Sequence, residues 1–255
     1  MHFPIALSDA VWPLLVTLVF ILAGLVKGVV GLGLPTVAMA LLALLMTPAQ
    51  AAALLIVPSL ATNVWQIRPW PALWPLLRRL APMQIGVCIG TLAGAWALGA
   101  PAGAWATACL GAALVGYAVW GLTGARLTVR AASEPWLGPL IGAATGLVTA
   151  ATGVFVIPAV PYLQALGLQR DALIQAMGIS FTVSTVALAA GLYFNAQYSS
   201  ASLGASVMLL LPALAGMAAG QHLRHRLSPV LFRKVFLASL IVLGLHMVLK
   251  EMLAP

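Results

Sequence analysis

Long apolar runs separated by short polar stretches make up most of this chain. A run of about 20 apolar residues crosses a bilayer as a helix. The pattern therefore predicts membrane helices over residues 11–30, 48–66, 80–98, 103–122, 136–152, 171–194, 203–220 and 229–249. Two other runs, residues 35–46 and 158–168, are shorter. At about 1.5 Å per residue the first of these reaches about 18 Å, less than a bilayer core of about 30 Å. We expect each short arm to enter the membrane and stop.

Glycines interrupt the apolar pattern at corresponding places in the two halves. Each break has a Gly, a second Gly seven residues later and then a Pro, which are Gly24, Gly31 and Pro35 in the first break and Gly146, Gly153 and Pro158 in the second. A pair of interrupted segments of this kind is typical of a transporter's substrate site. Three predicted helices follow each break. We expect an all-α membrane protein with two repeats, residues 1–124 and 136–255, joined by a cytoplasmic linker, residues 125–135.

Basic residues mark one side of the membrane. Ten of the twelve lysines and arginines lie in residues 68–79, 126–130, 170 and 224–234, whereas the turns 99–102 and 195–202 contain none. Loops rich in Lys and Arg stay in the cytoplasm, so these stretches are predicted inside and the turns outside. Three crossings separate the breaks, which predicts an inverted repeat with both termini outside. The charges do not distinguish a re-entrant hairpin from two tilted crossings within each interrupted pair.

Composition excludes a soluble domain. Hydrophobic residues make up 63% of the chain and charged residues 6%, whereas a soluble domain is about a quarter charged. The net charge of +8 comes without a basic run or RNA-binding motif, so we expect no nucleic-acid partner. Cys88 and Cys109 lie in apolar runs without a C-x-x-C motif, and we expect no disulfide framework, metal site or cofactor. The N-terminus has no basic region or cleavage site, so we expect no removable signal peptide.

The breaks offer backbone groups to an anion. A broken helix in lipid leaves N–H and C=O groups without partners, and these are tolerated only in a cavity or inside the protein. Pro35 and Pro158 suit the first turn of a helix, where the missing N–H is no loss. Two half-helix N-termini, each with a partial positive charge, are therefore expected to aim at one point near the membrane middle. Such a site favours an anion.

Lys27 is the one charged residue inside the first break. A charge in an apolar segment costs about 2.5 to 3.5 kcal/mol on insertion scales, which makes it a candidate for function. The alternative is that its side chain extends to the membrane surface. Gly28, Gly31 and Gly33 either offer N–H groups to the anion or allow close helix packing, and the two uses are compatible.

Neutral polar residues follow each break. One face of the next helix carries Ser59, Thr62, Asn63 and Gln66 in the first half, and the corresponding helix carries Gln175, Ser180, Thr182, Ser184 and Thr185. Taken singly, each side chain is better explained by a hydrogen bond between helices than by a substrate contact. Together they suggest a substrate site, for which the candidates are Lys27, Gly28, Gly31, Gly33, Asn63, Gln66, Thr149, Thr152, Gly153, Gln175, Ser180 and Thr182.

Carboxylates are absent from the predicted membrane interior. The four acidic residues lie at segment ends, and they are Asp9, Glu134, Asp171 and Glu251. This disfavours cation binding and a carboxylate proton relay. Neither a G-x-S-x-G nor an H-E-x-x-H motif is present, so we expect no catalytic residues and no enzyme activity.

The two interrupted segments also carry a family resemblance. The segments Gly-Leu-Val-Lys-Gly-Val-Val-Gly-Leu-Gly-Leu-Pro35 and Gly-Leu-Val-Thr-Ala-Ala-Thr-Gly-Val-Phe-Val-Ile-Pro158, each followed by a short apolar arm, resemble the sulfite exporter TauE/SafE family, also called the toluene sulfonate uptake permeases. The resemblance covers nearly the whole chain. Many members have Gly-Gly-Gly in the break, where this chain has Gly-Leu-Gly-Leu-Pro.

This resemblance implies a function and a location. It implies a secondary transporter in the bacterial inner membrane that carries sulfite, sulfonates or related organic anions, with export expected. An anion channel and a non-transporting membrane subunit stay open as alternatives. The expected partners are a small anion and the lipid bilayer, and a homodimer is an open possibility.

Overall fold

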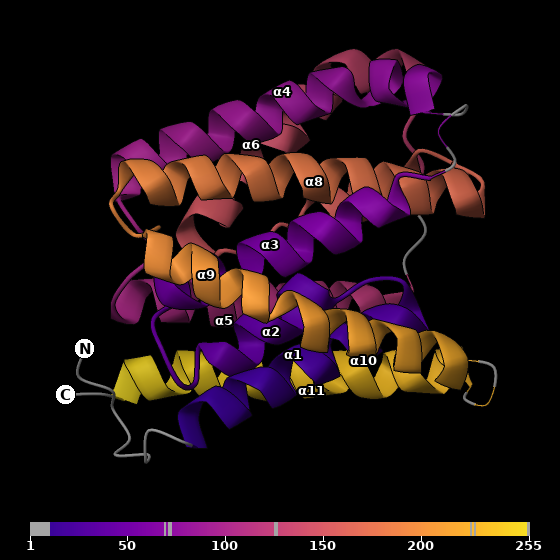
Figure 1. Cartoon of the computed structure of the whole chain (residues 1–255). Coiled ribbons are helices and arrows are strands. Elements are labelled where there is room, and N and C mark those ends of the chain that lie inside the picture. The colour runs from indigo at the N-terminus through magenta and orange to yellow at the C-terminus, as the bar shows by residue number, and fades with distance from the viewer. Residues whose placement is uncertain are drawn as a thin grey trace.

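The computed structural model describes residues 11–68, 70, 73–124, 127–224, 226 and 228–253. These residues form helices and no strand. The α-helices, drawn in Figure 1, are α1 (Val11–Val30), α2 (Leu34–Leu42), α3 (Pro48–Gln66), α4 (Leu73–Leu98), α5 (Ala104–Thr123), α6 (Glu134–Thr152), α7 (Ala159–Ala165), α8 (Arg170–Phe194), α9 (Ser200–Met208), α10 (Leu210–Leu223) and α11 (Pro229–Leu253). The expectations for Asp9, Arg126 and both chain ends fall outside the described residues.

Helix boundaries differ from the prediction at two places. α4 begins at Leu73 instead of residue 80, so Arg78 and Arg79 lie on a helix. The predicted helix over residues 203–220 is two helices, α9 and α10, which meet at Leu209. Pro212 explains this interruption, because its ring conflicts with the carbonyl of the residue four positions earlier.

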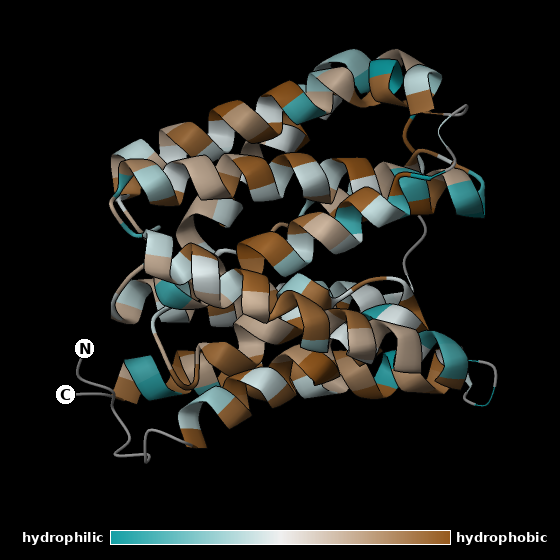
Figure 2. Cartoon of the chain, viewed as in Figure 1, coloured by the Kyte–Doolittle hydropathy of each residue, from teal (hydrophilic) through white to brown (hydrophobic). Residues whose placement is uncertain are grey.

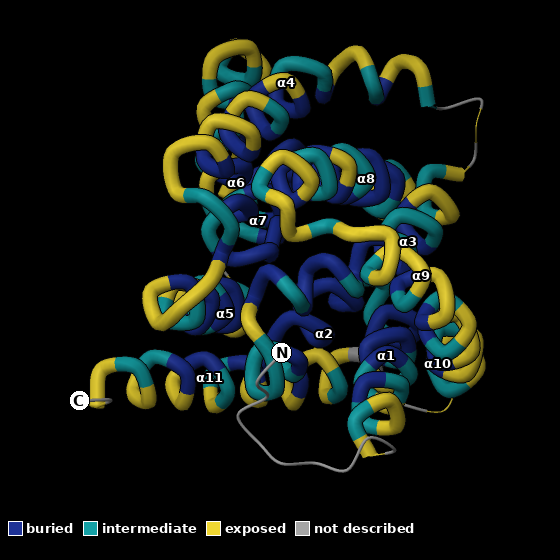
Figure 3. The backbone as a smooth tube through the Cα atoms, turned by 60° about the vertical axis from the view of Figure 1, so that its left-hand side comes forward, coloured by how far each residue is buried: buried dark blue, intermediate teal, exposed yellow. Residues whose placement is uncertain are grey.

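Within the described part of the chain, six helical segments are long and apolar enough to cross a membrane, namely α1, α4, α5, α8, α9–α10 and α11. The short arms α2 and α7 are enclosed by other helices, and Figure 3 draws both mostly in the colour of buried residues. In Figure 2 the hydrophilic residues gather at one end of the bundle, where α4 and α8 begin and α10 ends. Arg68 lies over the Trp65 ring at this end, 4.2 Å from its centroid.

Helices of the two halves pack against each other. α4 packs on α6, α1 on α10, α5 on α11 and α3 on α8. The order of helices matches α1 with α6, α3 with α8, α4 with α9–α10 and α5 with α11. Under this match the packed pair α4–α6 corresponds to the packed pair α1–α10. The packed pairs α5–α11 and α3–α8 each join a helix to its own counterpart. The halves are therefore interlocked in one body instead of packing as two separate units.

Glycines let two of these pairs approach closely. A Cβ atom on Gly24 or Gly28 of α1 would lie 2.2 or 2.3 Å from a backbone oxygen of α10. The same holds for the α4–α6 pair, where a Cβ atom on Gly142 would lie 2.0 Å from the Met83 carbonyl oxygen. Glycines four residues apart bring helix backbones together in this way. The packing interpretation of Gly28 is thus confirmed.

Pro58 interrupts the hydrogen bonding inside α3, and a side chain of α9 bonds the backbone groups that are left without partners. Proline prevents the carbonyl four residues earlier from accepting its usual bond. The Ser206 hydroxyl donates to that carbonyl, of Leu54, at 2.8 Å and accepts from the Val57 N–H at 3.0 Å. A hydroxyl from a neighbouring helix is one way to satisfy freed backbone groups in a membrane.

Candidate functional site

The first break joins α1 to α2 through two glycines with left-handed backbone. Gly31 has φ +83° and Gly33 has φ +113°, a conformation that glycine adopts without strain. Pro35 lies in the first turn of α2, as predicted. A Cβ atom on Gly31 would contact nothing within 4 Å, whereas one on Gly33 would meet Val26 at 3.2 Å. Open space therefore lies beside Gly31.

Lys27 is buried one turn before this break, with 3% of its surface exposed. Its Nζ donates hydrogen bonds to Thr62 Oγ1 at 3.0 Å and Asn63 Oδ1 at 2.5 Å, both on α3. The alternative in which Lys27 extends to the membrane surface is wrong. Lys27 makes no ion pair with any described residue. An ammonium has three N–H donors, so one is left without an acceptor in the described part of the chain.

Hydroxyl and amide groups extend this contact from α3 to α8. Asn63 Nδ2 donates to Ser59 Oγ at 3.1 Å, and Ser59 Oγ lies 3.3 Å from Thr185 Oγ1. Thr62 and Thr185 belong to the polar pattern of α3 and α8 but are not among the predicted site residues. Thr62 could have been predicted, because it lies on the same polar face of α3 as Asn63.

Two glutamines fix the end of α3. Gln66 Nε2 donates to the Gly31 carbonyl at 2.7 Å, and Gln175 Nε2 donates to the Ile67 carbonyl at 2.6 Å. Gln66 Oε1 is buried without a hydrogen-bond partner. The first break is thus tied to the last residue of α3.

The second break is filled by apolar side chains. Gly153 has φ +72°, and a Cβ atom there would lie 2.8 Å from Met39 Cε and 3.3 Å from Ala52 Cβ. Phe155 and Phe181 are both buried, with ring centroids 5.2 Å apart. Thr152 Oγ1 accepts a hydrogen bond from the Val154 N–H at 3.1 Å, so this side chain bonds the backbone just after the end of its own helix.

The two breaks lie at opposite ends of α3. The first contacts Gln66, its last residue, and the second contacts Ala52, in its first turns. The 14 residues between them span about 21 Å along a helix. The two N-termini therefore do not converge on one point as the sequence suggested. The reason is that α1 and α6 run through 20 and 19 residues, nearly a full crossing each, before they break.

The remaining candidates form separate contacts. Ser180 Oγ lies 3.0 Å from Gln84 Nε2 of α4, which is a hydrogen bond between helices. Thr182 and Thr149 each donate to a carbonyl of their own helix, at 2.7 Å. Among the described residues, no hydrogen bond connects these three side chains with Lys27. Lys27, Asn63, Gln66 and Gly31 are the candidates that the structure brings together.

An ion pair joins α4 and α6 at the hydrophilic end. Arg79 donates to both Glu134 carboxylate oxygens, at 2.8 and 2.6 Å, and to the Leu166 carbonyl at 3.3 Å. These hydrogen bonds hold the pKa of the Glu134 carboxyl below its ordinary value. The other described carboxylates, Asp171 and Glu251, lie in the first turn of α8 and near the end of α11. No group of three or more His, Cys, Asp and Glu side chains suited to a metal occurs among the described residues.

The family model described as sulfite exporter TauE/SafE matches residues 16–247. This match includes both breaks and every candidate site residue. No curated protein and no solved structure matches the chain.

Proposed function

The chain belongs to the sulfite exporter TauE/SafE family, and we propose that it is a secondary transporter that exports sulfite, a sulfonate or a related small organic anion. The anion binds at Lys27, beside the open space at Gly31. The Thr62 hydroxyl and the Asn63 amide, which now bond Lys27, hold its ammonium in place. Lys27 supplies the charge. The Gly31 N–H already donates to the Lys27 carbonyl at 2.8 Å, so Gly31 provides open space and not a free donor.

The single observation that carries this proposal is a buried lysine without an anionic partner. A buried charge is stable only when it is paired and hydrogen-bonded. Thr62 and Asn63 supply neutral bonds and no negative charge. A bound anion supplies the missing charge, and the neutral neighbours leave Lys27 available to it because no carboxylate competes for the ammonium.

The polarity of the α3–α8 contact supports alternating access. Near the hydrophilic end this contact holds Asn63, Gln66 and Gln175. Towards the other end it holds Leu55, Leu188 and Leu192, all buried. Polar side chains towards one end of the contact and apolar ones towards the other suit one state of a carrier that opens to each side in turn.

Topology is part of the proposal. The basic end faces the cytoplasm of a bacterial inner membrane, both termini lie outside, and the halves are inverted repeats. The exchange of helix pairs between the halves and the gathering of hydrophilic residues at one end support this. Labelling of single cysteines placed in the turn 99–102 and at position 170, the first residue of α8, from each side of the membrane tests it. Labelling of both positions from the same side contradicts the assignment.

Transport into proteoliposomes tests the function. We expect uptake of one anion from a panel of sulfite, sulfate, sulfoacetate, taurine, lactate and chloride. Asn63→Asp, which is nearly isosteric, should lower the transport rate at least tenfold because its carboxylate competes with the anion for Lys27. Lys250→Met, at the exposed end of α11, is the control and should leave the rate unchanged. Current beyond carrier rates would indicate a channel, and no flux of any anion would favour a non-transporting subunit.

A further inference from the structure

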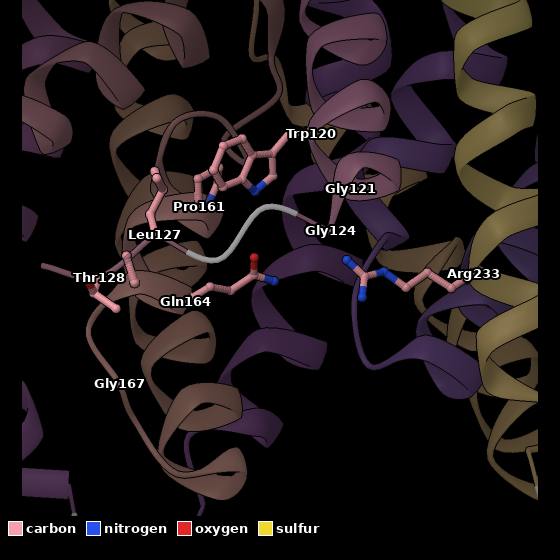
Figure 4. Close-up of a pocket in the computed structure, with 10 residues that line it drawn as sticks. Trp120, Gly121, Gly124, Leu127, Thr128, Pro161, Gln164, Gly167 and Arg233 are labelled. Carbon is pink, nitrogen blue, oxygen red and sulfur yellow. The ribbon is translucent and has the colours of Figure 1, made fainter.

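A cavity of about 380 Å³ lies outside the Lys27 site, where the end of α5, the arm α7 and the start of α11 meet. Its wall includes Trp120, Thr128, Pro161, Gln164 and Arg233 (Figure 4). None of the substrate candidates lines it. It opens at the end of the bundle where α10 and α11 are joined, the end that carries most of the arginines.

Among the residues that the structure describes here, the cavity combines the cation of Arg233 with neutral donors and an apolar wall. Figure 4 shows the Arg233 guanidinium and the Gln164 amide extending towards the same space. None of the described residues that line this cavity is acidic. Arg233 makes no ion pair or hydrogen bond with the residues that the structure describes. Its fork of donors is therefore available to an anionic group from outside the chain.

The surroundings of the cavity fit a lipid better than a free ion. The cavity wall is itself partly apolar, with Trp120, Leu127 and Pro161. The two long helices that flank it, α5 and α11, also expose apolar side chains on their other faces, among them Val119 and Leu231. Trp120 offers an indole N–H next to an apolar ring, the combination found at membrane surfaces. An occupant with an anionic head and apolar tails matches both parts.

We propose that this cavity binds the phosphate headgroup of an anionic phospholipid from the leaflet at the arginine-rich end. Arg233 donates to two phosphate oxygens, and the Gln164 amide donates to the phosphate or to the glycerol group. The acyl chains lie along α5 and α11. Basic pockets between helices on the cytoplasmic side bind such headgroups. The site does not depend on which anion the protein transports.

Native mass spectrometry of the full chain in detergent tests this site, with phosphatidylglycerol and phosphatidylcholine titrated at equal concentrations. We expect wild type to retain phosphatidylglycerol preferentially. Arg233→Gln should weaken that binding about fivefold, the factor expected for the loss of one basic contact. Gln164→Glu should weaken it as well, because it places a negative charge beside the phosphate. Both side chains are exposed, so neither substitution disturbs the buried packing.

The neighbouring Lys234→Gln is the matched control. It removes the same charge from the same exposed helix turn but does not line the cavity. Equal losses in Arg233→Gln and Lys234→Gln would reduce the effect to surface charge and overturn the proposal. Equal retention of the two lipids by wild type would also overturn it. Soluble glycerol 3-phosphate is the third arm, and its displacement of phosphatidylglycerol at low millimolar concentration would assign the cavity to a free phosphate compound.

Discussion

In the first break Lys27 is bonded to a hydroxyl and an amide, and open space lies beside Gly31. In the second break Phe155 packs on Phe181, and Gly153 lies against Met39. Both breaks use the same backbone device, a left-handed glycine followed by a proline. The glycine and the proline therefore only interrupt the helix. The side chains around it decide whether the opening holds a charge or an apolar core.

Placing a lysine at the corresponding position of the second break gives the largest expected loss of stability. Thr149 corresponds to Lys27 and is fully buried against its own helix. Thr149→Lys would bury a charge without the partners that Lys27 has, which should destabilise the protein by about 3 kcal/mol or more. Loss of the folded peak in size-exclusion chromatography or a large drop in the melting temperature would measure it. A normal melting temperature would show that the second break accommodates charge as the first does.

Truncation of an apolar side chain in the second break should lower the stability of the fold without changing the anion affinity. Phe155→Ala leaves a cavity beside Phe181, and such truncations cost about 3 kcal/mol in buried sites. We expect a lower melting temperature with the anion affinity changed less than twofold. Lys27→Met should give the opposite result. A Phe155→Ala protein that is stable but does not bind the anion would place substrate contacts in the second break.

Glycine substitutions compare the two backbones. Gly31→Ala meets open space, so its cost is the strain of a left-handed alanine, about 1 kcal/mol. Gly153→Ala has the same strain and also displaces Met39, which lies 2.8 Å from the added methyl position. Thermal unfolding should therefore rank Gly153→Ala below Gly31→Ala. The reverse order would mean that the first break is the more tightly packed of the two.

The Arg79–Glu134 pair gives the smallest effect and a baseline away from both breaks. The Arg79 side chain is 40% exposed, and pairs near a surface contribute about 1 kcal/mol or less. The pKa of Glu134 is below its ordinary value in the folded protein, so any stabilisation is present at neutral pH and is lost as the pH falls through that pKa. Glu134→Gln should remove this pH dependence in thermal unfolding scans. An unchanged acid response would mean that other groups cause it.

The repeated order of helices was predictable from apolar run lengths and from the Gly and Pro positions, because these depend on local sequence. The bounds of α1 were predicted to the residue, and so was the end of α3. The position of each break along the bundle was not predictable, since it depends on which end of α3 packs against it. Nor was the bond from Lys27 to Asn63, which joins residues 36 positions apart. Sequence pattern identified polar faces, but only the packing of helices separates Asn63 from Ser180, which instead bonds Gln84.

The central claim is that the Lys27 ammonium binds the transported anion. Isothermal titration calorimetry of purified wild type, Lys27→Met and Lys250→Met with sulfite, repeated with sulfoacetate and lactate, tests it most directly. We predict that wild type and Lys250→Met bind one of these anions alike, and that Lys27→Met binds it at least about 30-fold more weakly while it stays folded, since loss of a buried charge contact costs about 2 kcal/mol or more. Equal affinity in Lys27→Met would contradict the account.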